Sequence, residues 1–427
     1  MKKFACLLLT TLLLATMFAG CGGTSNTSTT APVAGDEGSN VPASDAVTLK
    51  FVRIGNDTAE ADYWKALIDR FQEENENIII EYDDAAIGEA METKLNTMFS
   101  AGLGPDLIGH GIMSVAARAE AGQYMDITDY YNNWEGKDDI MQSVLANGTY
   151  NDRIYGLAYS TTPFVFAYRT DLFENAGISA PPKTWDELAE YARKLTVKDG
   201  DNITTAGFAF PMTAGNFVEF DVFTFGNGGL YYDEEGNPTL DTPEKAEAFD
   251  FLMSFLDEVN MPYSATDVNP FVNGQAAMTL INNVALTSML NSEEYAGKVG
   301  IAVPPSNGNE ATFCGCNMLF VGGTSEHPDE AFKFIEAALS AEEVLERAKV
   351  LNIPVTRTSQ VEAFVELDPM NEVRARCVEV GIGMPRTTWA ASFQTVRNQM
   401  VQNVLYGEYT PAEALTEAQA TLLDEIG

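Results

Sequence analysis

Histidine, the side chain most often used for acid and base catalysis near neutral pH, is rare in this sequence. The chain contains two histidines, His110 and His327, and no HExxH, GxSxG or Walker A pattern. The sequence therefore offers few histidines for a catalytic triad or a zinc protease site. Among the residues that could carry chemistry, the histidines do not predict an enzyme.

Carboxylates are abundant, with 62 Asp and Glu residues, and they keep one enzymatic alternative open. Glycoside hydrolysis requires only two carboxylates at the right separation across a glycosidic bond. Such a pair cannot be recognised in a single sequence. A glycosidase-like enzyme therefore remains an alternative function.

Five cysteines are too few, and too unevenly placed, to predict a disulfide framework or a metal site. Cys6 and Cys21 lie near the N-terminus, which leaves Cys314, Cys316 and Cys377 in the rest of the chain. A disulfide between Cys314 and Cys316 would close a short, strained loop. No further Cys or His cluster completes a tetrahedral site. We expect Cys314 and Cys316 to be small structural residues, and we predict no metal and no cofactor.

The charge balance excludes one class of partner. The 62 acidic residues outnumber 25 basic ones, and the formal net charge is −37. A surface of this charge repels nucleic acid phosphates and anionic lipid headgroups. We therefore predict no nucleic acid partner, and we attribute the acidity mainly to solubility in an external medium.

The N-terminus has the pattern of an export signal. Lys2 and Lys3 precede an apolar run over residues 4–18, which is followed by Ala19, Gly20 and Cys21. Small residues before a cysteine resemble a bacterial lipobox, although Phe18 stands where an aliphatic residue is usual. We predict a signal peptide over residues 1–20 and lipidation of Cys21, which would anchor the protein to the outer face of the cell membrane. Ordinary signal cleavage and an uncleaved anchor are the alternatives.

Residues 21–46 are rich in Ser, Thr, Gly and Pro and contain almost nothing that can form a core. This composition predicts a flexible tether. No later stretch is apolar enough to span a bilayer. The sequence therefore predicts a folded body that is tethered to the membrane rather than embedded in it.

The elements that would position a site are clearest over residues 155–195. Residues 164–168 are apolar and aromatic on both faces, as in a buried strand. Thr184 and Glu187 form a capping box that starts a helix, and Leu188, Tyr191 and Leu195 follow at helical spacing. Residues 410–413 repeat the same capping pattern near the C-terminus.

The N-terminal part of the body alternates strands with helices. Strands are predicted at 47–51, 78–82 and 106–108, with helical stripes over 64–71 and 91–99. This order predicts a parallel sheet covered by helices, with ligands bound beyond the carboxyl ends of its strands. Later strands are predicted at 207–210, 276–281, 299–303 and 313–321, and helices at 217–229 and after Pro243 and Pro328.

Five segments together resemble family 1 extracellular solute-binding proteins, the receptors of bacterial ABC importers, most of which carry carbohydrates. They are YGLA…AYRTDLFENAGISAPPKTWDELAEYARKLT from Tyr155, GLGPDLI at 102–108, GQYMDIT at 122–128, FVNGQAAM at 271–278 and VLYGEYTPAEAL at 404–415. They occur in the family's order. The resemblance covers nearly all of the chain after the tether.

The resemblance implies an α/β fold of the periplasmic-binding-protein-like type II, with two discontinuous lobes joined by a hinge. Chain length also favours two cores over one. The N-terminal lobe would comprise residues 47–158 and 315–355, and the C-terminal lobe residues 162–311 and 360–427. Hinge crossovers are predicted at 159–161, 312–314 and 356–359. The implied protein is a monomer that delivers its ligand to the transmembrane permease subunits of an ABC transporter.

The predicted ligand-binding residues have side chains or backbone groups suited to sugar hydroxyls and sugar faces. Some follow predicted strands directly, and the others match segments that the family places around its ligand. They are Asn56, Asp57, Glu60, His110, Thr162, Phe164, Glu219, Asp221, Phe223, Asn282, Asn283, Gly315, Asn317, Arg386 and Trp389.

Several of these residues have a structural alternative. Asp57 would serve equally as a helix cap, and Phe223 lies in an aromatic run that is more typical of a core. Many sugar receptors of the family have Gly-x-Trp where this chain has Asn282-Asn283-Val284. Trp389, beside Arg386, is therefore the best remaining candidate for stacking on a sugar.

The sequence thus predicts a receptor that binds a mono- or oligosaccharide between two lobes without covalent chemistry. A receptor for another solute, such as a polyamine, is the alternative within the same class. No catalytic residue is predicted.

Overall fold

The computed structural model describes residues 46–427 except 56, 86–87, 214, 265–266, 291, 294 and 296. The predicted signal peptide, the tether up to residue 45, the lipidation site Cys21 and the candidate Asn56 lie outside the described residues. No helix in the described ranges is long and apolar enough to cross a membrane.

The first part of the sheet is built as the sequence predicts. Strands β1 (Val47–Ile54), β2 (Ile78–Ala85) and β3 (Leu107–Gly111) pair in parallel, with β1 in the centre. Helices α1 (Thr58–Glu74) and α2 (Glu89–Ser100) connect them. Asp106 braces the start of β3, because it accepts hydrogen bonds from the Lys50 amide at 2.8 Å and the Ser325 hydroxyl at 2.6 Å.

The predicted parallel part of the sheet is confined to β1, β2 and β3, and strands from later in the chain make the complete sheet mixed. Its order is β10-β6-β11-β3-β1-β2, and β11 (Thr312–Val321) runs antiparallel to both β3 and β6 (Gly156–Arg169). Strands β9 (Met278–Asn282) and β10 (Val299–Ala302) pair antiparallel with β6, and β12 (Gly381–Ile382) pairs with β11. Hydrophobic pattern shows that a strand is buried but not in which direction it runs.

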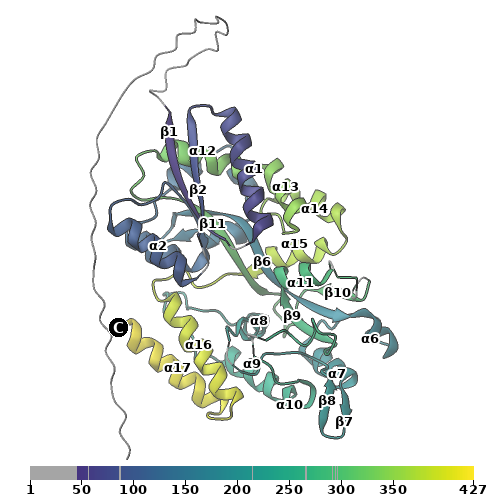
Figure 1. The fold of residues 1–427 in the computed structure, drawn as a ribbon. Coiled ribbons are helices and arrows are strands. Elements are labelled where there is room, and N and C mark those ends of the chain that lie inside the picture. The colour runs from purple at the N-terminus through teal and green to yellow at the C-terminus, as the bar shows by residue number, and fades with distance from the viewer. Residues whose placement is uncertain are drawn as a thin grey trace, which may run out of the picture. The chain divides into compact units, whose positions relative to one another are not determined.

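The long strand β6 changes partners along its length (Figure 1). Residues from Gly156 to Pro163 pair with β11, whereas residues from Phe164 to Arg169 pair with β9 and β10. The β6–β11 register shifts between Asn317 and Met318. Of the predicted hinge crossovers, 312–314 includes Cys314, which pairs with Pro163 at this change of partners, whereas 159–161 lies within the part of β6 that pairs with β11.

Aromatic side chains form the core between the first part of the sheet and the helices α1, α12 (Pro328–Ala338) and α13 (Ala341–Leu351). Trp64 of α1 is fully buried, and its ring centroid lies 5.6 Å from that of Phe51 and 4.9 Å from that of Tyr159. Phe334 of α12 lies 5.7 Å from Phe51. The apolar stripe predicted at 64–71 therefore faces the sheet.

A second core is built on the helices α7 (Trp185–Leu195), α8 (Val218–Gly226), α9 (Pro243–Met253), α16 (Ala390–Leu405) and α17 (Pro411–Ile426). Figure 1 shows α16 and α17 side by side, and α17 also contacts α9. The predicted strand at 207–210 is not formed. Within this range Ala209 makes an isolated bridge with Thr279, and the preceding Ala206 makes one with Ala276. The side chains of Phe208 and Phe210 are buried in this second core.

The remaining elements are short and connect these layers. They are η1 (Ile112–Ser114), α3 (Val115–Glu120), α4 (Thr128–Asn133), η2 (Lys137–Asp139), α5 (Gln142–Asn147), β4 (Thr149–Tyr150), β5 (Arg153–Ile154), α6 (Thr170–Asn175), β7 (Val197–Asp199), β8 (Asn202–Thr205), α10 (Leu256–Val259), α11 (Asn283–Leu290), η3 (Thr358–Gln360), α14 (Val361–Leu367) and α15 (Asn371–Glu379).

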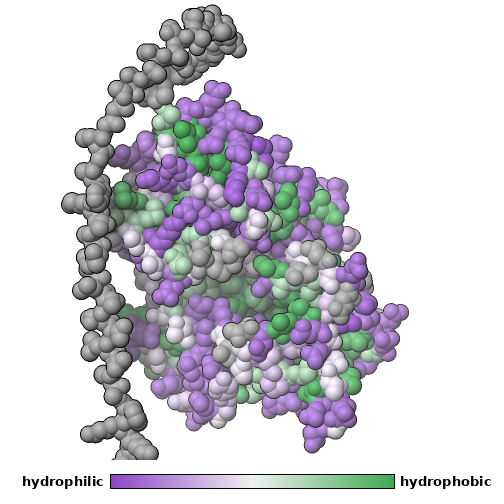
Figure 2. All heavy atoms as spheres, viewed as in Figure 1, coloured by the Kyte–Doolittle hydropathy of each residue, from purple (hydrophilic) through white to green (hydrophobic). Residues whose placement is uncertain are grey.

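Hydrophilic residues cover most of the face seen in Figure 2, and apolar residues gather across its middle.

The three cysteines of the described chain, Cys314, Cys316 and Cys377, are buried and free. Burial raises the pKa of the Cys314 thiol to about 12. A thiol that stays protonated at neutral pH is unreactive, as expected of a structural residue.

Both predicted capping boxes are confirmed, at Thr184 with Glu187 and at Thr410 with Glu413. Replacing the Thr184 hydroxyl removes a hydrogen bond acceptor from the first turn of α7. We expect Thr184→Ala to lower the free energy of unfolding by about 1 kcal/mol, measured by urea denaturation. Thr388→Ala, at an exposed position, is the control, and equal stability of the two variants would contradict the prediction.

Candidate functional site

One cavity of about 210 Å³ collects residues from three distant parts of the chain. It lies between the end of α5, the segment Leu230 to Tyr232 that follows α8, and the segment Gly381 to Arg386 that leads into α16. Its lining residues are Ser143, Ala146, Asn147, Leu230, Tyr231, Tyr232, Gly381, Ile382, Gly383, Met384 and Arg386.

Of two neighbouring predicted site residues, Arg386 lines this cavity, and Trp389 lies next to the lining residue Tyr232 without lining the cavity itself. Arg386 Nη1 donates to the carbonyl of Ala146 at 2.6 Å, and Nη2 donates to the hydroxyl of Tyr232 at 2.9 Å. The Trp389 ring centroid lies 6.4 Å from that of Tyr232, and the two rings are nearly perpendicular. Trp389 is half-buried, so one part of its ring remains open to solvent.

Gly383 allows the wall of the cavity to lie close to the sheet. A Cβ atom at this position would lie 2.2 Å from Asn147 Oδ1 and 2.6 Å from Ile112 Cδ1. Any side chain would therefore displace Asn147 or Ile112. Ile112 follows strand β3, so the cavity adjoins the end of the strand that carries His110.

A buried charge network holds the aromatic wall of the cavity. Asp221 is 2% exposed and pairs with Arg397, and its Oδ2 also accepts a hydrogen bond from the hydroxyl of Tyr231 at 2.9 Å. Lys245 donates to the carbonyl of Leu230, and burial lowers the pKa of its ammonium group to about 8. The structure therefore places Asp221, a predicted ligand contact, behind the wall, where it positions Tyr231.

Breaking this network from one side leaves a charge buried without its partner. We expect Asp221→Asn to lower the free energy of unfolding by about 3–5 kcal/mol, because Arg397 is almost fully buried. The variant Asp221→Asn with Arg397→Met removes both charges and should recover part of this loss. Urea denaturation of the two variants measures the difference, and a double variant less stable than the single one would contradict the explanation.

Glu219 lies on the same helix and has an unusual environment. The residue is partly exposed, but its Oε2 atom is buried and has no hydrogen bond partner. Burial raises the pKa of the Glu219 carboxyl to about 7, and the nearby Arg397 offsets only part of this effect. At neutral pH the folded protein therefore holds this carboxyl in both protonation states.

The raised pKa has a defined consequence for stability. Below pH 4.5 the carboxyl is protonated in both states, and the folded chain loses no stability there. Between pH 4.5 and 7 the unfolded chain releases its proton first, so stability falls as the pH rises. Above pH 7 the loss stays constant, on the order of 3 kcal/mol.

We therefore expect Glu219→Gln to stabilise the protein relative to the natural sequence at pH 8 and to have a smaller effect at pH 4. Denaturation midpoints across this range measure the difference. Glu425→Gln, at an exposed position near the C-terminus, is the control. A difference that does not change with pH would show that Glu219 titrates normally.

Strand pairing brings several other predicted residues into one region of the sheet. Asn317 of β11 lies opposite Gly111 of β3, next to His110, and opposite Ser160 of β6. Two residues along, Gly315 lies opposite Thr162. Phe164 pairs with Asn282 of β9, and its ring contacts that of Phe313 at 5.9 Å.

His110 is held by the carboxylate of Glu92. The residue is 7% exposed, and its Nε2 lies 3.0 Å from Glu92 Oε1, while Glu92 also pairs with Arg118. The hydrogen bond from His110, together with the Arg118 guanidinium, lowers the pKa of the Glu92 carboxyl to about 2. In this arrangement His110 joins β3 to α2.

The other predicted residues have structural partners. Asp57 caps α1 by accepting from the Glu60 amide at 2.9 Å, and Glu60 pairs with the buried Arg53 at 2.7 Å. Asn283 is buried and accepts two hydrogen bonds from Arg374, at 2.8 and 2.5 Å. Phe223 is fully packed among aromatic rings of the second core.

The cavity includes residues that the sequence did not single out. Tyr232 and Asn147 supply a hydroxyl and an amide to its lining, and Tyr231 supplies an aromatic wall. A pair of tyrosines after two glycines, in a segment rich in turn residues, was the available signal. No sequence pattern singles out Asn147, which lies at the end of the short helix α5.

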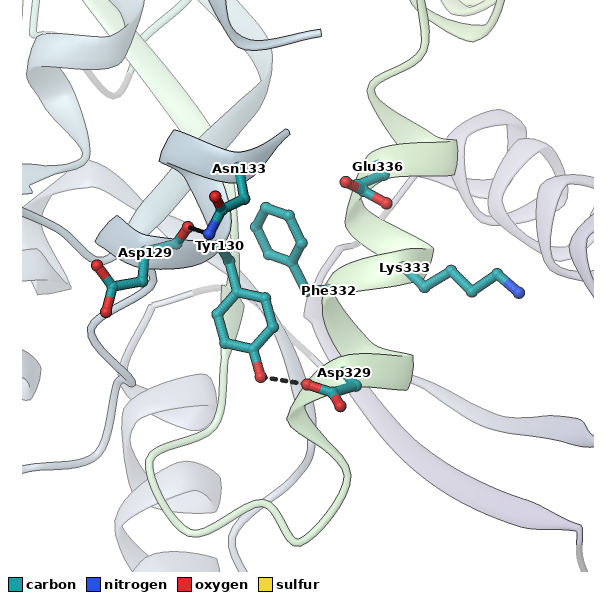
Figure 3. Close-up of a pocket in the computed structure, with 7 residues that line it drawn as sticks. All are labelled: Asp129, Tyr130, Asn133, Asp329, Phe332, Lys333 and Glu336. Atoms are coloured by element: carbon teal, nitrogen blue, oxygen red, sulfur yellow. Dashed lines mark hydrogen bonds between the residues drawn. The ribbon is translucent and has the colours of Figure 1, made fainter. Parts of the chain in front are cut away.

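A larger cavity, of about 410 Å³, lies on the surface between α4 and α12 and contains none of the predicted residues. Figure 3 shows the rings of Tyr130 and Phe332 side by side, with the Tyr130 hydroxyl pointing to Asp329. Asp129 and Glu336 add further carboxylates.

Within the described ranges, no group of three or more His, Cys, Asp or Glu side chains is placed to hold a metal ion.

Comparison with known proteins gives a consistent result. The model of the family "Bacterial extracellular solute-binding protein" matches residues 55–344. A putative binding protein of Brucella abortus is 27% identical over 286 residues, which are 64% of this chain and 67% of the relative. The maltotriose-binding protein of Pyrococcus abyssi is 24% identical over 313 residues, or 70% of this chain and 65% of the relative.

Solved structures agree in fold. An ABC transporter solute-binding protein of Thermotoga lettingae, bound with α-D-tagatose, is 25% identical, with a TM-score of 0.75 over 89% of this chain and 100% of that chain. The sugar-binding protein MalE of Xanthomonas citri is 20% identical, with a TM-score of 0.79 over 89% and 98%. These likenesses confirm the predicted periplasmic-binding-protein-like α/β fold.

Proposed function

Because the chain belongs to the bacterial extracellular solute-binding protein family, we propose that it is a receptor that binds a carbohydrate and delivers it to the permease of an ABC transporter. The relative named for maltotriose, and the similar structure that holds tagatose, support a sugar as the ligand. We place the ligand in the cavity between α5, Leu230 to Tyr232 and Gly381 to Arg386.

The observation that carries this proposal is the composition of that cavity. Sugars present hydroxyl groups at their edges and C–H groups on their faces, so they are held by polar side chains and aromatic rings together. The cavity combines Tyr231 and Tyr232 with the Asn147 amide and the Arg386 guanidinium, and Trp389 lies against Tyr232.

Binding would be coupled to closure of two lobes. In the predicted division, Ala146 belongs to the N-terminal lobe and Arg386 and Tyr232 to the C-terminal lobe. The hydrogen bond from Arg386 to the Ala146 carbonyl would then join the lobes. A ligand in the cavity would add contacts to both sides, and it would shift the equilibrium toward the closed form by its preference for that form.

The receptor would be held at the cell surface by a lipid on Cys21, with residues 21–46 as the tether, and would act as a monomer. The lipobox pattern in the sequence supports this part of the proposal. The family is extracellular, which fits an export signal over residues 1–20.

The composition of the cavity also weighs against the two alternatives. A polyamine is a cation and would require carboxylates, whereas no Asp or Glu lines this cavity in the described structure. A glycosidase requires two carboxylates across the bond that it cleaves. The same absence leaves the cavity without that pair, so we propose binding without catalysis.

Removing the stacking surface tests the proposed site. We expect Trp389→Ala to weaken saccharide binding roughly tenfold, because an aromatic face contributes both apolar area and a specific geometry. Isothermal titration with the best ligand from a screen of mono- and oligosaccharides measures the change. Tyr409→Ala, at an exposed aromatic position on another cavity, is the control.

Two results would contradict the proposal. The first is the absence of binding to any saccharide in the screen, together with no compaction in X-ray scattering. The second is release of reducing ends from an oligosaccharide, which would indicate an enzyme.

A further inference from the structure

The lining of the cavity has the opposite charge to the protein. The chain carries a formal charge of −37, yet the single charged side chain that lines the cavity in the described structure is Arg386. The larger cavity of Figure 3 presents the contrast, because Asp129, Asp329 and Glu336 line it with a single cation, Lys333. A lone cation in the cavity of an acidic protein favours an anion there.

Arg386 has no carboxylate partner among the described residues. Its hydrogen bonds go to neutral acceptors, the Ala146 carbonyl and the Tyr232 hydroxyl. The acidic group behind the wall, Asp221, is already neutralised by Arg397. The positive charge of Arg386 is therefore not compensated by the protein around it.

The geometry of the guanidinium leaves donors for a ligand. A guanidinium carries five N–H groups in a planar fork that matches a carboxylate or phosphate through two parallel hydrogen bonds. The two protein bonds use two of these donors, and Arg386 is only partly buried. Its two bonds also fix the plane of the fork, so little side-chain entropy is lost when an anion binds.

From these observations we infer that the ligand is an acidic saccharide whose carboxylate or phosphate group binds Arg386. This inference rests on the proposed function and specifies its substrate class. The Tyr232 hydroxyl and the Asn147 amide lie at the same cavity and are suited to the neighbouring sugar hydroxyls. The volume of about 210 Å³ is below the usual range for a drug-sized ligand, so the cavity suits one terminal sugar residue.

The test compares matched ligands on the folded, natural protein by isothermal titration. Galacturonic and glucuronic acid, with their short oligomers, form one arm, and the neutral sugars galactose and glucose, with theirs, form the second. Sugar phosphates form a third arm, which separates the two anionic groups. We expect roughly ten- to hundredfold tighter binding of one acidic arm than of its neutral counterpart, the usual effect of a hydrogen bond to a charged group.

Variants assign this preference to Arg386. Arg386→Met should remove the preference for the acidic sugar, whereas Arg386→Lys, which keeps the charge but loses the planar fork, should retain part of it. Arg193→Met, which removes an exposed arginine of α7, is the matched control and should leave both affinities unchanged. Added salt should weaken the binding of acidic sugars to the natural protein and should have little effect on the binding of neutral sugars.

The outcomes are distinguishable. If neutral sugars bind and acidic sugars bind no better, the inference is wrong and the proposed receptor function stands. If neither class binds, the proposed function itself fails. If Arg386→Met no longer binds neutral sugars either, the affinities of Arg386→Lys are compared instead. Equal affinity of this lysine variant for acidic and neutral sugars would also overturn the inference.

Discussion

The antiparallel pairing of β6 with β11 is the interaction on which the rest of the structure depends. The residues of β6 from Gly156 to Pro163 are bonded to β11, and the remainder of the same strand carries β9 and β10. One continuous strand therefore belongs to two parts of the sheet. The segments that reach the cavity are positioned by elements packed on these strands, since α5 contacts β6, α8 contacts β11 and β12 pairs with β11.

The second constraint is electrostatic and lies behind the cavity. Asp221 and Arg397 are both almost fully buried, which is unfavourable unless each charge has partners. The network satisfies them with Tyr231, with Asn216, whose side chain accepts from Arg397 at 2.7 Å, and with the Phe217 carbonyl. Its effect is to fix the position of Tyr231 in the wall. Asp221 and Arg397 thus fix the geometry of the cavity wall without lining the cavity themselves.

The distribution of charge then gives the cavity its chemical character. The acidic surplus of the chain lies elsewhere, and the lining contains one guanidinium with neutral partners. A cavity of this kind distinguishes between ligands by charge as well as by shape, because an ion that is partly shielded from water interacts more strongly with its counterion. The proposed receptor would therefore select among sugars through Arg386, a cation in a chain whose net charge is strongly negative.

The sequence by itself determined the elements that depend on neighbouring residues. The capping boxes at Thr184 and Thr410, the cap at Asp57 and the strands β1, β9 and β11 follow from local pattern, and the five ordered motifs identified the family. Only the tertiary structure decided that β11 runs against β3, that Asp221 lies behind the cavity wall and Phe223 in the second core, and that Asn147 and Tyr232 line one cavity with Arg386. The reason is physical: a cap or a strand is stabilised by residues a few positions apart, whereas strand direction, burial and a shared cavity arise from contacts between segments that are distant in the chain.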